Sequence, residues 1–112
     1  MLTDEMRYKL MRILQKNPEM SQRELARELG VSLGRINYCL QALIGKGLVK
    51  ARNFSNSTNK VSYVYVLTPR GIKQKASITL RYMRSKMAEF ESLRVEIERL
   101  RNEVGKSEPR EV

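Results

Sequence analysis

The segment from Met20 to Gly47 predicts two short helices joined by a tight turn. Ser21 and Glu24 have the spacing of a capping box, in which each side chain accepts a hydrogen bond from the backbone of the other at a helix N-terminus. Gly30 is suited to end that helix, because glycine adopts the left-handed conformation without strain. Ser32 can then cap a second helix, which leaves three residues between the two helices. Two helices with so short a connection predict a helix-turn-helix.

The second helix has one apolar side and one polar side. Its apolar residues recur at helical spacing: Leu33, Ile36, Leu40, Leu43 and Ile44. The opposite side and its flanks contain no acid: Gly34, Arg35, Asn37, Tyr38, Gln41 and Gly45. Side chains of these types bind phosphates and base edges, so we expect this face to contact nucleic acid. The alternative is an ordinary amphipathic helix pair in a small bundle, polar outside only because it is solvated.

The charges of the chain are unevenly distributed. The segment from Leu29 to Ala88 holds 11 of the 22 lysines and arginines and none of the 12 acids, so the net charge of +10 comes from this segment. A solvated surface normally mixes both signs, whereas a field of one sign favours a polyanion. The charge pattern therefore supports nucleic-acid binding, although it does not separate DNA from RNA.

Length and composition exclude several classes of protein. A chain of 112 residues with 41% hydrophobic residues has room for one small core and an extension. No apolar run approaches the roughly 18 residues of a membrane span, and the acidic N-terminus lacks the hydrophobic centre of a signal peptide, so we expect a cytoplasmic protein. Histidine is absent and Cys39 is the only cysteine, which excludes an intrachain disulfide and the zinc patterns built on Cys and His. No catalytic constellation stands out, so we expect neither an enzyme nor a cofactor or metal.

Cys39 lies between Ile36 and Leu43 on the second helix of the helix-turn-helix. We interpret it as a small, partly buried apolar residue. The alternative is a peroxide-sensing thiol, for which no neighbouring residue in the sequence supplies a convincing means of lowering the pKa.

A first helix and a hairpin flank this motif. Thr3 is expected to cap the first helix, which ends at Asn17-Pro18. Its buried stripe is expected to contain Met6, Leu10, Ile13 and Leu14. After Gly47, residues 48–54 and 61–67 are rich in Val, Tyr and Phe and are separated by a polar stretch, which predicts a two-stranded hairpin.

A hairpin directly after the second helix of a helix-turn-helix, the recognition helix, is typical of a wing. Arg52 and Lys60 bracket its polar tip, and Asn59 lies within it. We expect these residues to contact phosphates or the minor groove. A plain solvated turn would have the same sequence pattern and is the alternative.

The last helix is predicted to begin with Thr68 as its cap and Pro69 as its first residue. From Ile72 to Val104 apolar residues recur in a heptad register, interrupted by Lys86. The expected dimerisation residues are Met83, Phe90, Leu93, Ile97, Leu100 and Val104. A lone helix cannot bury this stripe, so a second copy is expected to cover it, although the first half could instead fold back onto the first helix.

The charges beside the stripe favour a parallel pair of helices. With Phe90, Ile97 and Val104 at heptad position a, glutamates occupy the g positions and Arg94 and Arg101 occupy the e positions. A parallel coiled coil sets g against e of the partner and so pairs opposite charges, whereas an antiparallel one pairs like charges.

These features in this order resemble the MarR-type winged helix-turn-helix transcriptional regulators. The similarity covers residues 1–104 and includes SQREL in the first helix of the motif, GLV after the second and LTPRG at the start of the last helix. The run RELARELGVSLGRINYCLQALIGKGLVKARNF and the short coiled-coil ending resemble the exopolysaccharide-associated subgroup in particular.

The resemblance implies a homodimeric regulator of transcription. It carries the family's recognition positions to Ser32, Gly34, Arg35, Asn37, Tyr38 and Gln41, and its wing positions to Asn59 and Lys60. The Asp-x-Arg wing signature of larger members is replaced here by residues 56–60. Larger members also hold phenolic ligands between additional helices that this chain does not contain, so a small-molecule effector is not expected.

The sequence thus predicts a mainly α fold with a two-stranded β wing. Residues 1–71 are expected to form a winged helix-turn-helix DNA-binding domain, 72–104 a dimerisation helix in a coiled coil, and 105–112 a frayed tail. The predicted function is sequence-specific binding of double-stranded DNA to regulate transcription, as a homodimer. The alternatives are a winged-helix module that binds a protein partner and one that binds RNA.

Overall fold

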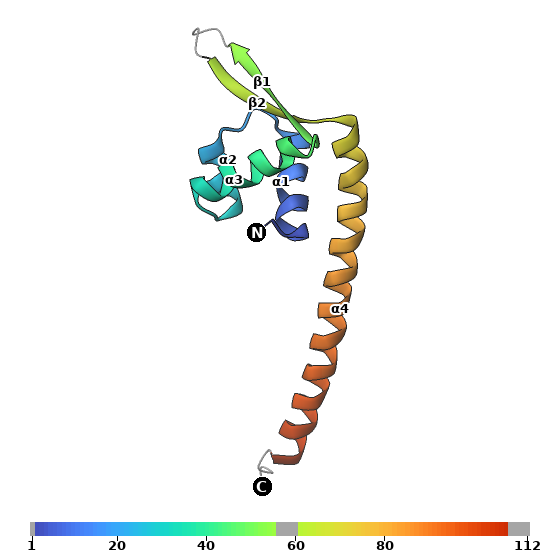
Figure 1. Ribbon diagram of the computed structural model, residues 1–112. Coiled ribbons are helices and arrows are strands. Elements are labelled where there is room, and N and C mark those ends of the chain that lie inside the picture. The colour runs from blue at the N-terminus through green and yellow to red at the C-terminus, as the bar shows by residue number, and fades with distance from the viewer. Residues whose placement is uncertain (1, 56–60, 108–112) are drawn as a thin grey trace.

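A computed structural model of the chain describes residues 2–55 and 61–107. Within these residues the chain forms the helices α1 (Asp4–Lys16), α2 (Gln22–Leu29), α3 (Leu33–Gly45) and α4 (Pro69–Ser107), with the strands β1 (Val49–Ser55) and β2 (Val61–Leu67) between α3 and α4 (Figure 1). The predicted fold class, mainly α with a two-stranded wing and a long final helix, is confirmed.

The helices begin and end where the capping residues predict. The Thr3 hydroxyl accepts a hydrogen bond from the backbone N–H of Met6 at 3.1 Å. Ser21 and Glu24 form the complete capping box at the start of α2, and Ser32 caps α3. Gly30 ends α2 with a φ of 68°, the left-handed conformation that glycine adopts without strain.

The core lies between α1, α2, α3, the base of the hairpin and one residue of α4. Most of its members come from the predicted apolar faces. Two details of the prediction were wrong. In α1, Ile13 was predicted to be buried but is only partly buried, and Met11 is buried instead. In α3, Leu33 was predicted to lie on the apolar side but is 43% exposed, because it lies in the first turn, beyond the packing partners of that face.

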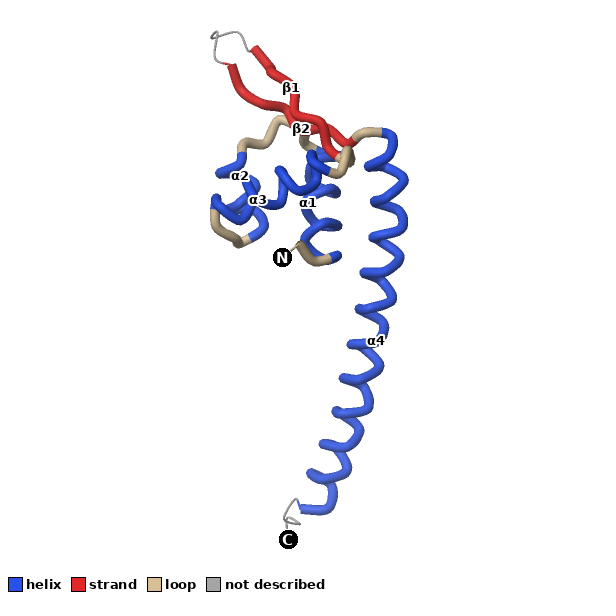
Figure 2. Tube along the Cα trace, in the orientation of Figure 1, coloured by secondary structure: helices blue, strands red, loops and turns tan. Residues whose placement is uncertain are grey.

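The antiparallel hairpin projects away from the helices (Figure 2). Its register runs from the pair Val49 and Leu67 at the base to the pair Ser55 and Val61. The base is held at Tyr65, whose ring is buried and whose backbone N–H donates to the Pro18 carbonyl at 3.2 Å.

Helix α4 begins against the core and then leaves it. Thr68 caps it by accepting from the N–H of Gly71 at 3.0 Å, and Ile78 is the buried α4 side chain in the core cluster. The second half of α4 extends past the other elements and gives the molecule a longest dimension of 76 Å (Figure 1). The helix continues through Gly105 to Ser107, three residues beyond the expected end at Val104. Among the described residues no helix is apolar over a length sufficient to span a membrane.

Candidate nucleic-acid interface

Helix α3 presents most of the predicted binding residues to solvent. Ser32, Gly34, Asn37, Tyr38 and Gln41 are exposed, and the Tyr38 side chain retains 55% of its accessible surface. The opposite side of the helix packs into the core through Ile36, Cys39, Leu40 and Leu43. The packing of this apolar side fixes the direction in which the exposed residues of α3 face solvent.

Arg35 differs from its neighbours because it is only partly exposed. It lies one helical turn before Cys39 and hydrogen-bonds its thiol. Burial raises the pKa of the Cys39 thiol, and the charge and hydrogen bond of Arg35 offset part of that effect. The cysteine is fully buried, as expected of an apolar packing residue and unlike a reactive thiolate.

A chain of side-chain hydrogen bonds connects α3 to the hairpin through α2. The Gln22 amide Nε2 donates to the Tyr65 hydroxyl at 2.9 Å, and its Oε1 accepts from Nδ2 of Asn37 at 3.4 Å. Gln22 was not among the residues predicted to form the site. Its place in the first turn of α2 gives no sign of this role, which arises when folding brings Tyr65 beside it.

On the hairpin, Arg52 is exposed at the middle of β1, paired with Val64, and so lies farther from the tip than predicted. Asn59 and Lys60, the other two predicted wing contacts, lie outside the described residues. Of the three predicted wing residues, the structure therefore describes Arg52, which lies on the projecting hairpin.

Part of the basic segment stabilises the fold. Arg81 binds Asp4 with its Nε 3.0 Å from Oδ2, and this hydrogen bond is the main reason that the pKa of Asp4 is lowered. Lys86 lies 3.8 Å from Glu5, and Lys75 lies over the ring of Tyr8. These α4 cations join α4 to α1, so fewer positive charges are free for a polyanion than the sequence count indicates.

Comparison with known proteins identifies this arrangement. Residues 3–50 match a family model described as winged helix-turn-helix DNA-binding. The chain has a winged helix-turn-helix fold. No curated protein sequence matches it.

Solved transcriptional regulators share this winged helix-turn-helix fold. A PadR-like regulator from Bacillus cereus superposes with a TM-score of 0.68 at 18% identity, over 78% of this chain and 89% of that chain. The regulator PA4135 has a TM-score of 0.54 at 25% identity, over 96% and 80% of the two chains. FabT of Streptococcus pneumoniae, solved in complex with DNA, has a TM-score of 0.52 at 19% identity, over 86% and 69%. The family match is to a DNA-binding domain, and the solved proteins that share the fold are transcriptional regulators.

The predicted dimerisation residues form an exposed stripe along α4, most of it beyond the winged domain. Phe90 is 68% exposed and Leu93 is 53% exposed, and the rest of the predicted set is also accessible: Met83, Ile97, Leu100 and Val104. None of the other described elements covers them (Figure 1). In the first half of α4, Ile78 is buried in the core and Tyr82 stacks on Tyr8 of α1. The alternative of folding back therefore applies to these two residues and leaves the stripe uncovered.

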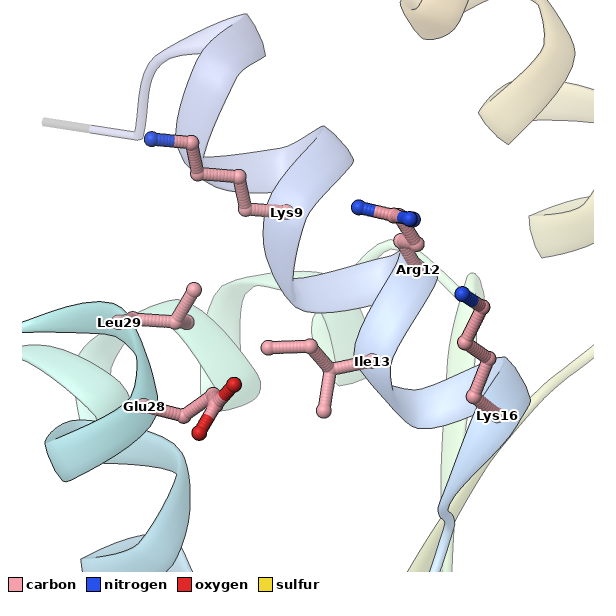
Figure 3. A pocket seen from close by; sticks show the side chains of 6 residues that line it. All are labelled: Lys9, Arg12, Ile13, Lys16, Glu28 and Leu29. Atoms are coloured by element: carbon pink, nitrogen blue, oxygen red, sulfur yellow. The ribbon is translucent and has the colours of Figure 1, made fainter.

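A separate groove lies between α1 and α2 of the winged domain (Figure 3). Its volume is about 410 Å³, and its floor contains Ile13 and Leu29. Lys9, Arg12 and Lys16 follow one another along α1 at its edge, and Glu28 lies on the α2 side. None of the predicted DNA-binding residues lines this groove.

Proposed function

We propose that this protein is a sequence-specific, double-stranded DNA-binding transcriptional regulator that acts as a homodimer in the cytoplasm. The observation that carries the proposal is the exposed, acid-free face of α3 within a winged helix-turn-helix fold. A helix with such a face fits the major groove, where amide and guanidinium groups distinguish base pairs.

Each predicted site residue has a role in this proposal. Arg35, Asn37, Tyr38 and Gln41 face base edges, and the exposed N-terminus of α3 at Ser32 and Gly34 approaches a phosphate. Arg52, Asn59 and Lys60 bind the backbone or the minor groove from the wing.

The homodimer is proposed from the exposed stripe of α4. Apolar side chains at heptad spacing along an uncovered helix require a partner, and a second copy presents a matching stripe. The resulting twofold symmetry would set two recognition helices toward two half-sites of one operator. Residues 1–71, with the first turns of α4 packed on them through Ile78, would then form the DNA-binding domain. The rest of the 72–104 helix would mediate dimerisation, and no small-molecule effector is required.

The resemblance to the exopolysaccharide-associated subgroup suggests the first target genes to examine. Selection of bound sequences from a random duplex pool would identify the operator directly. Exopolysaccharide promoters containing that sequence should then be bound in preference to unrelated promoters, and a pool without any enriched sequence would reject sequence-specific binding.

The salt dependence of binding tests the electrostatic part of the proposal. If the dimer contacts 6 to 10 phosphates, its affinity should fall by about 10³- to 10⁵-fold between 50 and 200 mM salt. Fluorescence anisotropy with a labelled duplex measures this effect, and an RNA duplex of the same sequence serves as the control. A flat salt response would reject the DNA interface, and equal binding of the RNA would favour the RNA-binding alternative.

The groove between α1 and α2 favours a second candidate function, binding of a protein partner. Arg12 and Lys16 lie one helical turn apart on α1 and line the groove together with the apolar Ile13 and Leu29. A partner helix with acids at the same spacing beside an apolar residue would complement it. Arg12→Glu combined with Lys16→Glu should abolish such an interaction. If the same double substitution weakened DNA binding instead, the groove would belong to the DNA interface.

A further inference from the structure

We propose that Gln22 is a specificity-determining residue, which holds the side-chain amide of Asn37 in the orientation that reads an adenine. This inference rests on the proposed function, because it assigns a chemical role within the DNA interface. Gln22 makes no predicted base contact of its own, so it is a positioning residue.

The position of Gln22 is fixed from the hairpin side. Its Nε2 donates to the Tyr65 hydroxyl at 2.9 Å. The Tyr65 ring is 6% exposed, and the backbone of the same residue is bonded to Pro18, so this anchor does not move independently of the core. Gln22 itself is half-buried at the start of α2, which the capping box of Ser21 and Glu24 holds in place.

The orientation of Asn37 follows from the carbonyl oxygen of the Gln22 amide. Oε1 of Gln22 accepts a hydrogen bond from Nδ2 of Asn37 at 3.4 Å. An asparagine amide has two N–H donors and one carbonyl acceptor, and only one of its N–H bonds lies on the same edge as the carbonyl. When the other N–H is directed to Gln22, Asn37 presents one donor and one acceptor side by side to solvent.

That pair of groups matches one purine. In the major groove adenine presents the N7 acceptor beside the N6 amino donor, which a bidentate asparagine satisfies, whereas guanine presents two acceptors. Rotation of the Asn37 amide by half a turn would place its carbonyl oxygen against Oε1 of Gln22 and leave two acceptors facing each other. With Nε2 of Gln22 directed to the Tyr65 hydroxyl, Gln22 selects this amide orientation before DNA is bound, which reduces the ordering cost of recognition.

The test compares two substitutions of Gln22 in the full chain. Gln22→Met retains the length of the side chain but removes both hydrogen-bonding groups. It should reduce the preference for adenine at one base pair by about tenfold, with less than a twofold change in affinity for unrelated duplexes. Gln22→Glu is the matched control, because its carboxylate accepts from both Asn37 and the Tyr65 hydroxyl. It should keep the adenine preference while weakening all sequences alike through its added negative charge.

Asn37→Ala identifies the base pair in question. This variant should lose preference at the same position as Gln22→Met, and the double variant should lose no more than Asn37→Ala alone, since the two residues act as a unit. Sequence selection gives the base preferences, and thermal unfolding checks that each variant is folded. If wild type selects a sequence and Gln22→Met keeps the full preference at the Asn37 position, the inference about Gln22 is rejected and the proposed function stands. If folded wild type selects no sequence, the proposed function is rejected, and the base-reading role is rejected with it.

Discussion

Gly71 is the residue on which the close approach of α4 to β1 depends. A Cβ atom at this position would overlap the backbone carbonyl of Leu48, which cannot move without displacing the start of β1. Gly71→Ala should therefore lower the free energy of unfolding by about 1–3 kcal/mol, the usual cost of overpacking. Gly45→Ala is the control, because a Cβ there meets nothing within 4 Å. It should be neutral or stabilise the helix by up to about 1 kcal/mol. Urea denaturation measures both, and equal effects would contradict a steric role for Gly71.

The thiol of Cys39 makes stability depend on pH. Burial raises the pKa of Cys39 in the folded state, whereas the thiol of an unfolded chain titrates near pH 8.5. Above that pH the unfolded chain loses a proton that the folded chain retains, so the free energy of unfolding should fall as pH rises. The stability of wild type relative to Cys39→Ala should decrease by up to about 1.4 kcal/mol per pH unit above roughly pH 8.5.

Denaturant titrations of both proteins at several pH values measure this difference, in which the common lysine and tyrosine titrations cancel. A difference that does not vary with pH would contradict the raised pKa. The peroxide-sensing alternative for Cys39 requires the opposite shift, and rapid modification of the folded protein by a thiol reagent at neutral pH would support it.

At the scale of elements, α4 has two functions along one continuous helix. Ile78 is 2% exposed in the core of the winged domain, whereas Ile97 is 41% exposed on the stripe. Ile78→Ala should cost about 2–5 kcal/mol of folding stability at every protein concentration. Ile97→Ala should instead weaken self-association and lower the melting temperature only where dimers are populated. Thermal unfolding at two protein concentrations, with sedimentation to measure mass, separates the two effects. An equal, concentration-independent loss in both variants would contradict the division of α4.

Sequence patterns predict some features of these helices well and others poorly. Caps at Thr3, Ser21, Ser32 and Thr68 were predictable because they depend on hydrogen bonds within three residues along the chain. The burial of Ile78 was not predictable, because Ile78 lies outside the heptad stripe of α4. Only the fold determines which side of α4 meets α1. The hydrogen bond between Gln22 and Asn37 joins the side chains of residues 15 apart in the sequence, so no local pattern predicts it.

At the scale of the whole molecule, the fold was predictable from the order of elements, whereas the mutual orientation of two copies depends on weak forces. Glu89 and Glu96 at g would face Arg94 and Arg101 of a parallel partner. Within one chain Arg94 already binds Glu91 at 2.7 Å, and Lys86 binds Glu89 at 3.0 Å. Exposed pairs contribute only up to about 1 kcal/mol each, so interchain pairing must compete with these intrachain bonds. It still favours the parallel arrangement, because the antiparallel one brings like charges together.

We therefore predict a parallel dimer that directs two recognition helices to half-sites on one face of the DNA, about 34–36 Å apart. Leu100→Cys in a Cys39→Ser background should form a disulfide-linked dimer under mild oxidation, because d positions of parallel helices lie opposite each other. Asn102→Cys, at the outward f position, is the control and should crosslink much more slowly. Nonreducing electrophoresis measures the linked fraction while light scattering reports the mass. A dimeric mass in which Leu100→Cys fails to crosslink would indicate antiparallel helices, and this would place the two winged domains at opposite ends of the coil, too far apart to share adjacent half-sites.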